Sequence, residues 1–259
     1  MKVLVLGAGK MVEAILTGLK NETDLSQFHL YSPSGTSARE LALRVGATFV
    51  QSVDDVKDPH FVWVGCKPQQ LSTLAQNLKG KFPEATFVSM LAALSEAEQC
   101  KTLGVAKLVR IMPNLPVKYK KGITLCSSAS AQSDLKQIIN LFSSIGVARV
   151  VSEAELEELT LLTGSGPALI YEFTKLLGQS FTSLNAPERE ELARMVLLGS
   201  AVSADSSAET LEEMINSVTS KAGVTIAALE KWRAMKLDEL MLEGITAGKT
   251  RMEEIKASH

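Results

Sequence analysis

The sequence predicts an α/β fold with a doubly wound, mostly parallel sheet up to residue 152, followed by an all-helical region over 153–259. Three observations support this prediction. Short apolar runs recur in the first region and alternate with segments of helical periodicity. A Gly-Ala-Gly turn follows the first apolar run and leads into a helical pattern. From Ser152 onward the apolar spacing is helical, and no strand pattern is evident.

Each predicted strand is a short apolar run bounded by turn residues. Such runs lie at residues 2–6, 29–32, 61–66, 86–90, 107–112, 122–126 and 147–151. Helices of the second region are predicted at residues 153–180, 187–206, 209–217, 224–233 and 236–256. The change of pattern places a domain boundary near residue 152. The apolar stripes of these helices can be buried within one chain or between two copies of it.

Composition and charge exclude several classes of protein. The 259 residues carry 27 Lys and Arg against 29 Asp and Glu, a net charge of −2, which excludes a strongly basic nucleic-acid-binding protein. The 3 cysteines and 3 histidines are scattered, so neither a disulfide framework nor a metal site is expected. The sequence has no apolar run of about 18 residues that could span a bilayer. We therefore expect a globular, cytoplasmic protein that binds no nucleic acid, no membrane and no metal.

The turn after the first strand has the features of a dinucleotide-binding turn. Gly7 and Gly9 stand where the backbone must turn sharply and approach a pyrophosphate. The next helix would present its N-terminus to that phosphate. Val12 occupies the position of the third glycine in the usual pattern, so the motif alone is weak. Its place at the first strand of an alternating α/β pattern favours cofactor binding over a simple turn.

The segment after the second strand favours NADP over NAD. Proteins that prefer NAD usually carry a carboxylate here, which holds the ribose hydroxyls. This chain has Ser32, Ser34 and Thr36 instead, with Arg39 nearby. Hydroxyls and a guanidinium suit the additional phosphate of NADP. Taken alone, the segment is explained equally well as an ordinary turn of Ser, Pro and Gly.

Two further strands end in residues suited to a ligand site. Lys67 and Pro68 follow a buried strand at the edge where open α/β sheets bind ligands. A surface lysine before a helix-starting proline is the simpler interpretation of that pair taken alone. Asn114 lies between Pro113 and Pro116 in a stiff loop, which suits the orientation of a cofactor or substrate but also occurs for structure alone.

Two segments interrupt the helical pattern of the second region. Residues 163–168 contain two glycines and a proline, which disfavour a helix unless a kink or a close approach is needed. Residues 216–225 offer hydroxyls and backbone N–H groups ahead of a helix, a plausible cradle for a substrate carboxylate. Each segment taken alone is also explained as a helix cap.

Five motifs, in order, resemble those of the pyrroline-5-carboxylate reductase family. They are GAGKM at 7–11, VGCKPQQ at 64–70, VRIMPNLPV at 109–117, LTGSGPALIYEF at 162–173 and VTSKAGVTIAALE at 218–230. The resemblance implies an N-terminal Rossmann domain and a C-terminal helical dimerisation domain, in a homodimer or an assembly of dimers. It also implies reduction of 1-pyrroline-5-carboxylate to L-proline, the last step of proline biosynthesis, with NADPH, or alternatively NADH, as hydride donor.

The resemblance also assigns site residues. Those expected to bind the dinucleotide are Gly7, Gly9, Lys10, Met11, Ser32, Ser34, Thr36, Cys66, Lys67, Pro68 and Asn114, the last near the nicotinamide. Those expected to hold the substrate carboxylate are Val218, Ser220, Gly223 and Thr225. An imine protonates more readily than a carbonyl, so no strong general acid is required. We expect the Thr225 hydroxyl to be the catalytic group, donating a hydrogen bond to the imine nitrogen or relaying a proton through water.

The chain departs from the family pattern in both halves. Lys10 stands where the family usually has Asn, and Val12 where it has Ala. Lys221 and Ala222 replace Pro and Gly in the substrate segment, which alters its stiffness and its allowed backbone angles. Ser220, Gly223 and Thr225, which are assigned to the substrate carboxylate, are retained.

Two other functions stay open at this point. A hydroxyacid dehydrogenase also joins a Rossmann domain to a helical domain, and Lys175 would be its proton-transferring lysine. An exposed lysine on an amphipathic helix is the simpler interpretation of that residue. The altered substrate segment also fits a cofactor-binding paralogue without catalysis. A cluster of Lys118, Lys120 and Lys121 would suit an acidic partner, although such lysines are usually just solvated.

Overall fold

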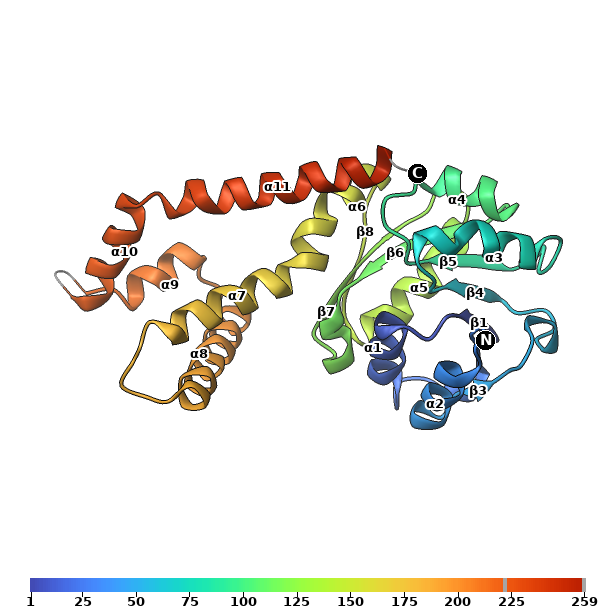
Figure 1. The fold of residues 1–259 in the computed structure, drawn as a ribbon, viewed down its shortest axis with the longest axis horizontal. Coiled ribbons are helices and arrows are strands. Elements are labelled where there is room, and N and C mark those ends of the chain that lie inside the picture. Colours follow the sequence, from blue (N-terminus) through green and yellow to red (C-terminus); the bar gives the residue numbers. More distant parts are fainter. Residues whose placement is uncertain (221–222, 258–259) are drawn as a thin grey trace. The chain divides into compact units, whose positions relative to one another are not determined.

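The computed structural model describes residues 1–220 and 223–257, and it divides into two compact units (Figure 1). The first unit, here called the α/β unit, runs from Met1 to Ser165 and includes the C-terminal residues from Met252 on. The second, the helical unit, is Gly166–Arg251. The domain boundary predicted near residue 152 stays a prediction.

The α/β unit is built on a single sheet. Within the described residues the sheet has 8 strands in the order β3-β2-β1-β4-β5-β6-β7-β8. All neighbouring pairs are parallel except β6 and β7. The strands are β1 Val3–Leu6, β2 Phe28–Tyr31, β3 Thr48–Phe49, β4 Phe61–Val64, β5 Thr86–Ser89, β6 Leu108–Pro113, β7 Gly122–Ser127 and β8 Gly146–Val150. The predicted α/β fold with a mostly parallel sheet is therefore confirmed, while the two-residue strand β3 was not predicted.

Helices connect most of the strands, and the region after the sheet is helical, as predicted. The helices of the α/β unit are α1 Lys10–Leu19, α2 Thr36–Val45, α3 Leu71–Leu78, α4 Glu96–Leu103, α5 Gln132–Ser143 and α6 Glu153–Thr160. A π-helical turn at Leu161–Ser165 follows α6. The helices that follow this turn are α7 Gly166–Gln179, α8 Ala186–Ser206, α9 Leu211–Ser217, α10 Val224–Ala234 and α11 Leu237–Ala257.

The core of the α/β unit lies on both faces of the sheet. Along β1, Val3 and Val5 belong to one buried cluster, whereas Leu4 and Leu6 belong to another. Alternate side chains of a strand point to opposite faces, so a strand covered by helices on both sides must be apolar at every position. This explains why the first predicted strand is a continuous apolar run rather than an alternating one.

An ionic cluster around the buried Arg110 joins β6 to α6 and to the end of α11. The guanidinium of Arg110, only 1% exposed, lies 2.8 Å from a carboxylate oxygen of Glu153 and 3.6 Å from one of Glu157. Lys256 in turn lies 2.7 Å from the Glu157 carboxylate. Because a buried guanidinium needs charged partners, this cluster fastens α6 and the last turn of α11 to the sheet.

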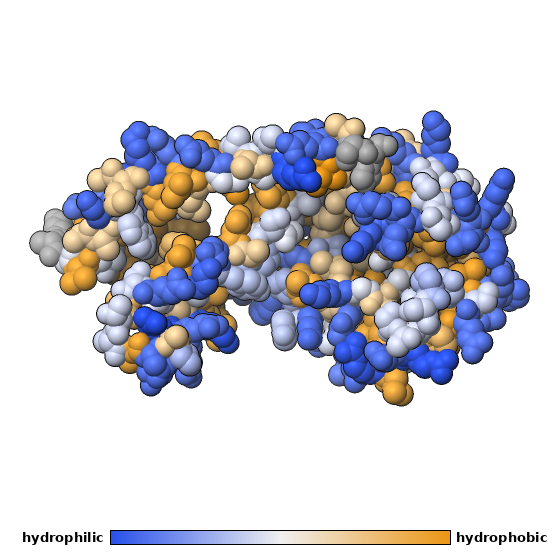
Figure 2. Space-filling view, in the orientation of Figure 1, coloured by the Kyte–Doolittle hydropathy of each residue, from blue (hydrophilic) through white to orange (hydrophobic). Residues whose placement is uncertain are grey.

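The helical unit buries few of its side chains. Helices α7 and α8 pack closely where a Cβ added to Gly178 would lie 3.2 Å from the Cβ of Ala193. The rings of Phe173 and Trp232 meet edge to face, with centroids 6.0 Å apart. Many large apolar side chains are nevertheless exposed, and Figure 2 shows apolar residues on the surface of these helices. Examples are Leu169, Ile170, Leu176, Met195, Leu198, Leu240, Met241 and Leu242.

Candidate functional site

A pocket of about 260 Å³ lies where β1, β4, β5 and β6 end. Between β1 and β4 the strand order reverses, because β2 and β3 extend the sheet on one side and β5 and β6 on the other. Open α/β sheets bind their ligands at such a switch point. The lining residues are Gly9, Lys10, Met11, Val12, Gly65, Cys66, Lys67, Met90, Met112 and Pro113.

The glycine turn after β1 fits tightly against the end of β4. Gly7 has φ +109°, in the region that favours glycine, and a Cβ added there would lie 2.8 Å from the carbonyl oxygen of Gly65. The Gly7 N–H donates to the carbonyl of Tyr31 at 2.9 Å, so the turn is also held against β2. The turn therefore requires glycine for its own geometry.

Val12 is accommodated because the facing residue is a glycine. A Cβ added to Gly65 would lie 2.6 Å from the Cγ2 atom of Val12. The close packing at this point requires one small residue. Here Gly65, at the end of β4, is that residue, whereas in the usual pattern it is a glycine in the first turn of α1. Val12 in place of the third glycine of the pattern is thus compatible with a dinucleotide-binding turn.

Among the described residues, three helices have a glycine as N-cap residue and no side-chain capping hydrogen bond. They are α1 at Gly9, α2 at Gly35 and α10 at Gly223. By contrast, α4, α6, α8 and α9 begin with full capping boxes, whereas α3 and α5 lack caps but begin at other residues. N–H groups in an uncapped first turn are available to an anion. All three glycine starts fall in segments that the sequence assigns to ligands.

The turn after β2 has the chemistry expected for a phosphate. Ser32 is buried and its hydroxyl accepts a hydrogen bond from Ser37 at 3.2 Å, while Ser34 and Thr36 are exposed. The Cζ atom of Arg39 lies 4.7 Å from the centre of the Phe49 ring, which holds the guanidinium on that aromatic face. Hydroxyls and one guanidinium are therefore presented here. None of these β2-turn residues lines the 260 Å³ pocket itself.

The segment after β4 contributes a thiol and a lysine to the pocket. Burial raises the pKa of the Cys66 thiol, so it is protonated at neutral pH and is a poor nucleophile. Lys10 and Lys67 are exposed, and the described residues that line the pocket with them include no carboxylate. The pocket therefore combines positive charge with apolar walls. The side chain of Pro68, also predicted to contact the cofactor, lies outside the described atoms.

Asn114 is not among the pocket-lining residues, although its neighbours Met112 and Pro113 are. It is buried, and its side-chain amide is hydrogen-bonded at both ends, to the carbonyl of Thr163 and to the N–H of Ile123. Its predicted place near the nicotinamide stays a prediction.

Several lining residues were not predicted from the sequence. Gly65, Met90 and Met112 end or follow buried strands, and they look like ordinary core residues in the sequence. Their position at the carboxyl ends of β4, β5 and β6, on the same side of β1, was the available signal.

The predicted substrate segment belongs to the helical unit. Val218 ends α9 and is exposed, and the Gly223 N–H donates to the carbonyl of Ser220 at 3.0 Å. Thr225 lies exposed in the first turn of α10. Lys221 and Ala222, where the chain departs from the family, lie outside the described residues. That this segment meets the dinucleotide pocket stays a prediction.

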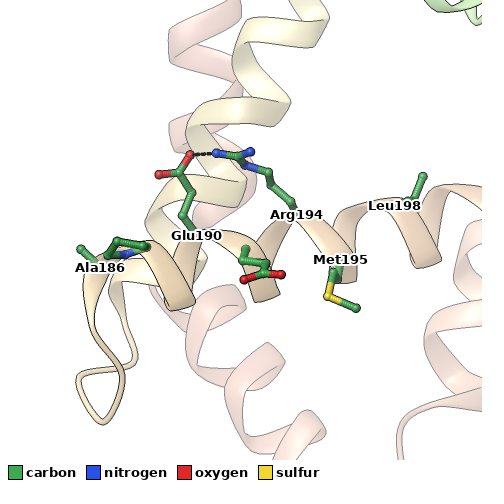
Figure 3. A pocket seen from close by; sticks show the side chains of 7 residues that line it. Ala186, Glu190, Arg194, Met195 and Leu198 are labelled. Atoms are coloured by element: carbon green, nitrogen blue, oxygen red, sulfur yellow. Dashed lines mark hydrogen bonds and ion pairs between the residues drawn. The ribbon is translucent and has the colours of Figure 1, made fainter.

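A second hollow, of about 660 Å³, runs along α8 (Figure 3). All of its lining residues come from this one helix, and Glu190 pairs with Arg194 beside it. Lys175, the lysine of the dehydrogenase alternative, forms an ion pair with Glu172 on the surface of α7. The surface of one helix does not enclose a small ligand, so we place the functional site at the sheet edge.

No cluster of three or more His, Cys, Asp or Glu that could hold a metal ion is present among the described residues. None of the described helices combines the length and apolar character needed to cross a membrane.

The parallel sheet, the glycine turn at its switch point and the helical unit that follows define a dinucleotide-dependent oxidoreductase. Residues 2–93 match the family model described as NADP oxidoreductase coenzyme F420-dependent. Residues 153–255 match the one described as pyrroline-5-carboxylate reductase dimerisation. The resemblance to the pyrroline-5-carboxylate reductase family that the sequence predicts is thereby confirmed, and individual relatives extend it along the chain.

Relatives and solved structures cover almost the full length. Pyrroline-5-carboxylate reductase of Staphylococcus epidermidis is 29% identical over 245 residues, 89% of this chain and 89% of that protein. The structure of the Streptococcus pyogenes enzyme is 26% identical, with a TM-score of 0.85 over 98% of both chains. The Plasmodium falciparum pyrroline carboxylate reductase with NADP bound has a TM-score of 0.85 over 99% of this chain and 98% of that one. At 18% identity, this last similarity shows the fold alone.

Proposed function

We propose that this chain reduces 1-pyrroline-5-carboxylate to L-proline, with NADPH as the preferred hydride donor and NADH as a second one. The observation that carries the proposal is the pocket at the β1–β4 switch point, lined by the glycine turn and two lysines, in a chain that resembles this reductase family over its length. The protein would act as a homodimer, or an assembly of dimers, in the cytoplasm, without nucleic-acid partners.

Residues that line the pocket and residues of the adjoining turns would divide the binding of the dinucleotide between them. Gly7 and Gly9 allow the backbone to approach the pyrophosphate, which the first turn of α1 would bind through its N–H groups. The hydroxyls after β2 would take the extra phosphate of NADP. When bound, the cofactor supplies the hydride that reduces the C=N bond. The methionines that line the pocket, Met11, Met90 and Met112, exclude water from the reacting end.

The substrate segment would hold the carboxylate and the ring nitrogen. Val218, Ser220 and Gly223 surround the start of α10, whose uncapped first turn suits a carboxylate. We assign to the Thr225 hydroxyl the hydrogen bond or water-mediated proton relay to the imine nitrogen. Thr225→Val should lower kcat about 100-fold with unchanged NADPH affinity. Thr219→Val, which removes a neighbouring hydroxyl bonded to the Ile215 carbonyl, is the matched control.

The experiment that tests the function is NADPH oxidation by the purified protein with pyrroline-5-carboxylate, beside NADH and a piperideine carboxylate. Proline formation with NADPH as the better donor is the expected result. NADPH binding without imine reduction would point to the non-catalytic paralogue instead. Oxidation of hydroxyacids without imine reduction would favour the dehydrogenase, and Lys175 would then become the residue to change.

Gly9 offers a test of the cofactor site that separates binding from folding. A Cβ added at Gly9 meets no atom of the described residues within 4 Å, and its φ of −76° suits alanine. Gly9→Ala should therefore leave stability unchanged but weaken NADPH binding about tenfold, because the methyl group enters the space of the pyrophosphate. Gly46→Ala is the converse control. It lies at φ +81° away from the pocket, so it should cost about 1 kcal/mol of stability and leave NADPH binding unchanged.

A further inference from the structure

The side chain of Asn114 extends the pairing of β6 with β7. The registered pairs end at Pro113 opposite Thr124, so the next partner of Asn114 is Ile123. Instead of a backbone group, Oδ1 of the Asn114 side chain accepts the hydrogen bond of the Ile123 N–H, at 2.8 Å. One end of this amide therefore continues the sheet beyond the last residue of β6.

The other end of the amide binds the π-helical turn Leu161–Ser165. Nδ2 of Asn114 donates to the carbonyl oxygen of Thr163 at 2.9 Å. In an α-helix that carbonyl would accept the N–H of the residue four positions later. Here that residue is Pro167, which has no N–H, so the only helical backbone donor left to this carbonyl is the π-type partner five positions later, Ala168. Asn114 thus supplies the donor that the proline removes.

Two further observations concern the side chain of Asn114, which forms these two hydrogen bonds in the described structure. Asn114 is the N-cap residue of the 3-10 turn Leu115–Tyr119, yet its side chain forms no capping hydrogen bond. An asparagine at this position usually does. The side chain is also only 5% exposed, so water does not compete for either bond. Its two preceding residues, Met112 and Pro113, form part of the pocket wall.

We propose that Asn114 is a positioning residue: it replaces the N–H missing at Pro167, locks the π-helical turn onto the ends of β6 and β7, and thereby fixes the pocket wall at Met112 and Pro113. This inference rests on the proposed function, because the wall it fixes is the one that faces the reacting end of the dinucleotide. A wall displaced by less than 1 Å would misalign the hydride donor more than it would weaken binding.

The first test replaces the amide with an isosteric carboxylate. Asn114→Asp keeps an acceptor for the Ile123 N–H but has no donor for the Thr163 carbonyl when ionised. We expect kcat to fall about 10- to 100-fold at neutral pH, with the Kd for NADPH changed less than about threefold. Asn140→Asp, an exposed site on α5, is the matched control and should retain wild-type kcat. Wild-type kcat in Asn114→Asp would overturn the inference.

The second test restores the missing donor. Pro167→Ala provides an N–H four residues after Thr163, and alone it should leave kcat within about twofold of wild type. Combined with Asn114→Asp, it should recover at least about fivefold of the lost kcat, because the Thr163 carbonyl again has a donor. If the kcat of the double variant is no higher than that of Asn114→Asp, the inference that Asn114 replaces the missing N–H of Pro167 is wrong.

Amide hydrogen exchange separates this inference from the proposed function. Asn114→Asp should accelerate exchange in the turn at residues 161–166 at least about tenfold, and Pro167→Ala should reverse that change. These outcomes do not depend on turnover. If the wild-type protein fails to reduce the imine but the exchange pattern holds, the proposed function falls and the structural role of Asn114 stands. If exchange in the turn is unchanged, the inference about Asn114 is overturned whatever the activity.

Discussion

The α/β unit and the helical unit bury their apolar side chains to very different extents. In the α/β unit, every residue of β1 and β4 is buried, and two clusters cover the two faces of the sheet. In the helical unit, no described residue of α9, α10 or α11 is buried, although these helices carry many apolar side chains. The first unit thus completes its core with its own chain, whereas the second requires another surface.

This difference explains the pattern along the helices. A helix that packs on one side has a single apolar stripe, whereas large apolar residues spread over several exposed faces indicate a helix buried in an assembly. The match of residues 153–255 to a dimerisation family fits that interpretation. From the sequence alone, the apolar stripes of these helices can be buried within one chain or between two copies of it. Their exposure in the single chain favours burial between two copies.

The strongest test of the self-contained core is Trp63→Ala. Trp63 is fully buried on β4, with its ring centroid 5.5 Å from that of Phe28 and 5.8 Å from that of Phe142. Truncation should lower the free energy of unfolding by about 3–5 kcal/mol. The loss should be independent of protein concentration in urea titrations, because the core lies within one chain. A loss below about 1 kcal/mol, as expected for a surface residue, would contradict the buried core.

The next test addresses the helical unit. Leu198 on α8 is 66% exposed in the chain, and Leu43 on α2 is 86% exposed. If α8 is covered by a second copy, Leu198→Glu buries an unpaired charge and should weaken dimerisation by about 2–4 kcal/mol. Leu43→Glu introduces the same charge on the other unit and should leave the dimer intact. Sedimentation velocity at several concentrations measures both, and equal behaviour of the two variants would remove the distinction between the units.

The smallest expected effect is a pH dependence that comes from the α/β core. Burial raises the pKa of Cys126 on β7 from 9.0 to about 12. Above pH 9 the unfolded chain loses this proton while the folded protein keeps it, so stability falls as pH rises from 9 toward 12, by about 1.4 kcal/mol per pH unit. Urea unfolding under reducing conditions at pH 10 and pH 11, both between the two pKa values, should show this slope in the wild type. Cys126→Ala should show a slope shallower by that amount, and an identical slope would contradict the burial of the thiol.

Much of the α/β fold was predictable because apolar periodicity reports burial directly. Strand β3 was missed because it has only two residues, Thr48 and Phe49, and both are half-buried. The antiparallel direction of β7 was also not predicted. Its signal was the short connection from Pro113 to Gly122, since a parallel crossover needs a dozen or more residues.

The residues of the candidate site that lie at strand ends were predictable from the sequence. The contacts that depend on packing between distant parts of the chain were not. Gly9, Lys10, Cys66 and Lys67 meet in one pocket because their strands are neighbours. The two hydrogen bonds of Asn114 depend on residues 9 and 49 positions further along the chain, which no local pattern reveals.

The buried guanidinium of Arg110 has a consequence for the order of assembly. Its partners Glu153 and Glu157 lie 43 and 47 positions later in the chain. Because an unpaired guanidinium is strongly disfavoured in an apolar interior, β6 cannot be covered in its final form before α6 is present. During synthesis, which proceeds from the N-terminus, we expect the first strands to assemble while the ribosome is still producing this region. The sheet would then be completed only when the residues after Ser152 emerge from the ribosome. The packing of α6 against β6 would therefore be the last step in the folding of the α/β unit.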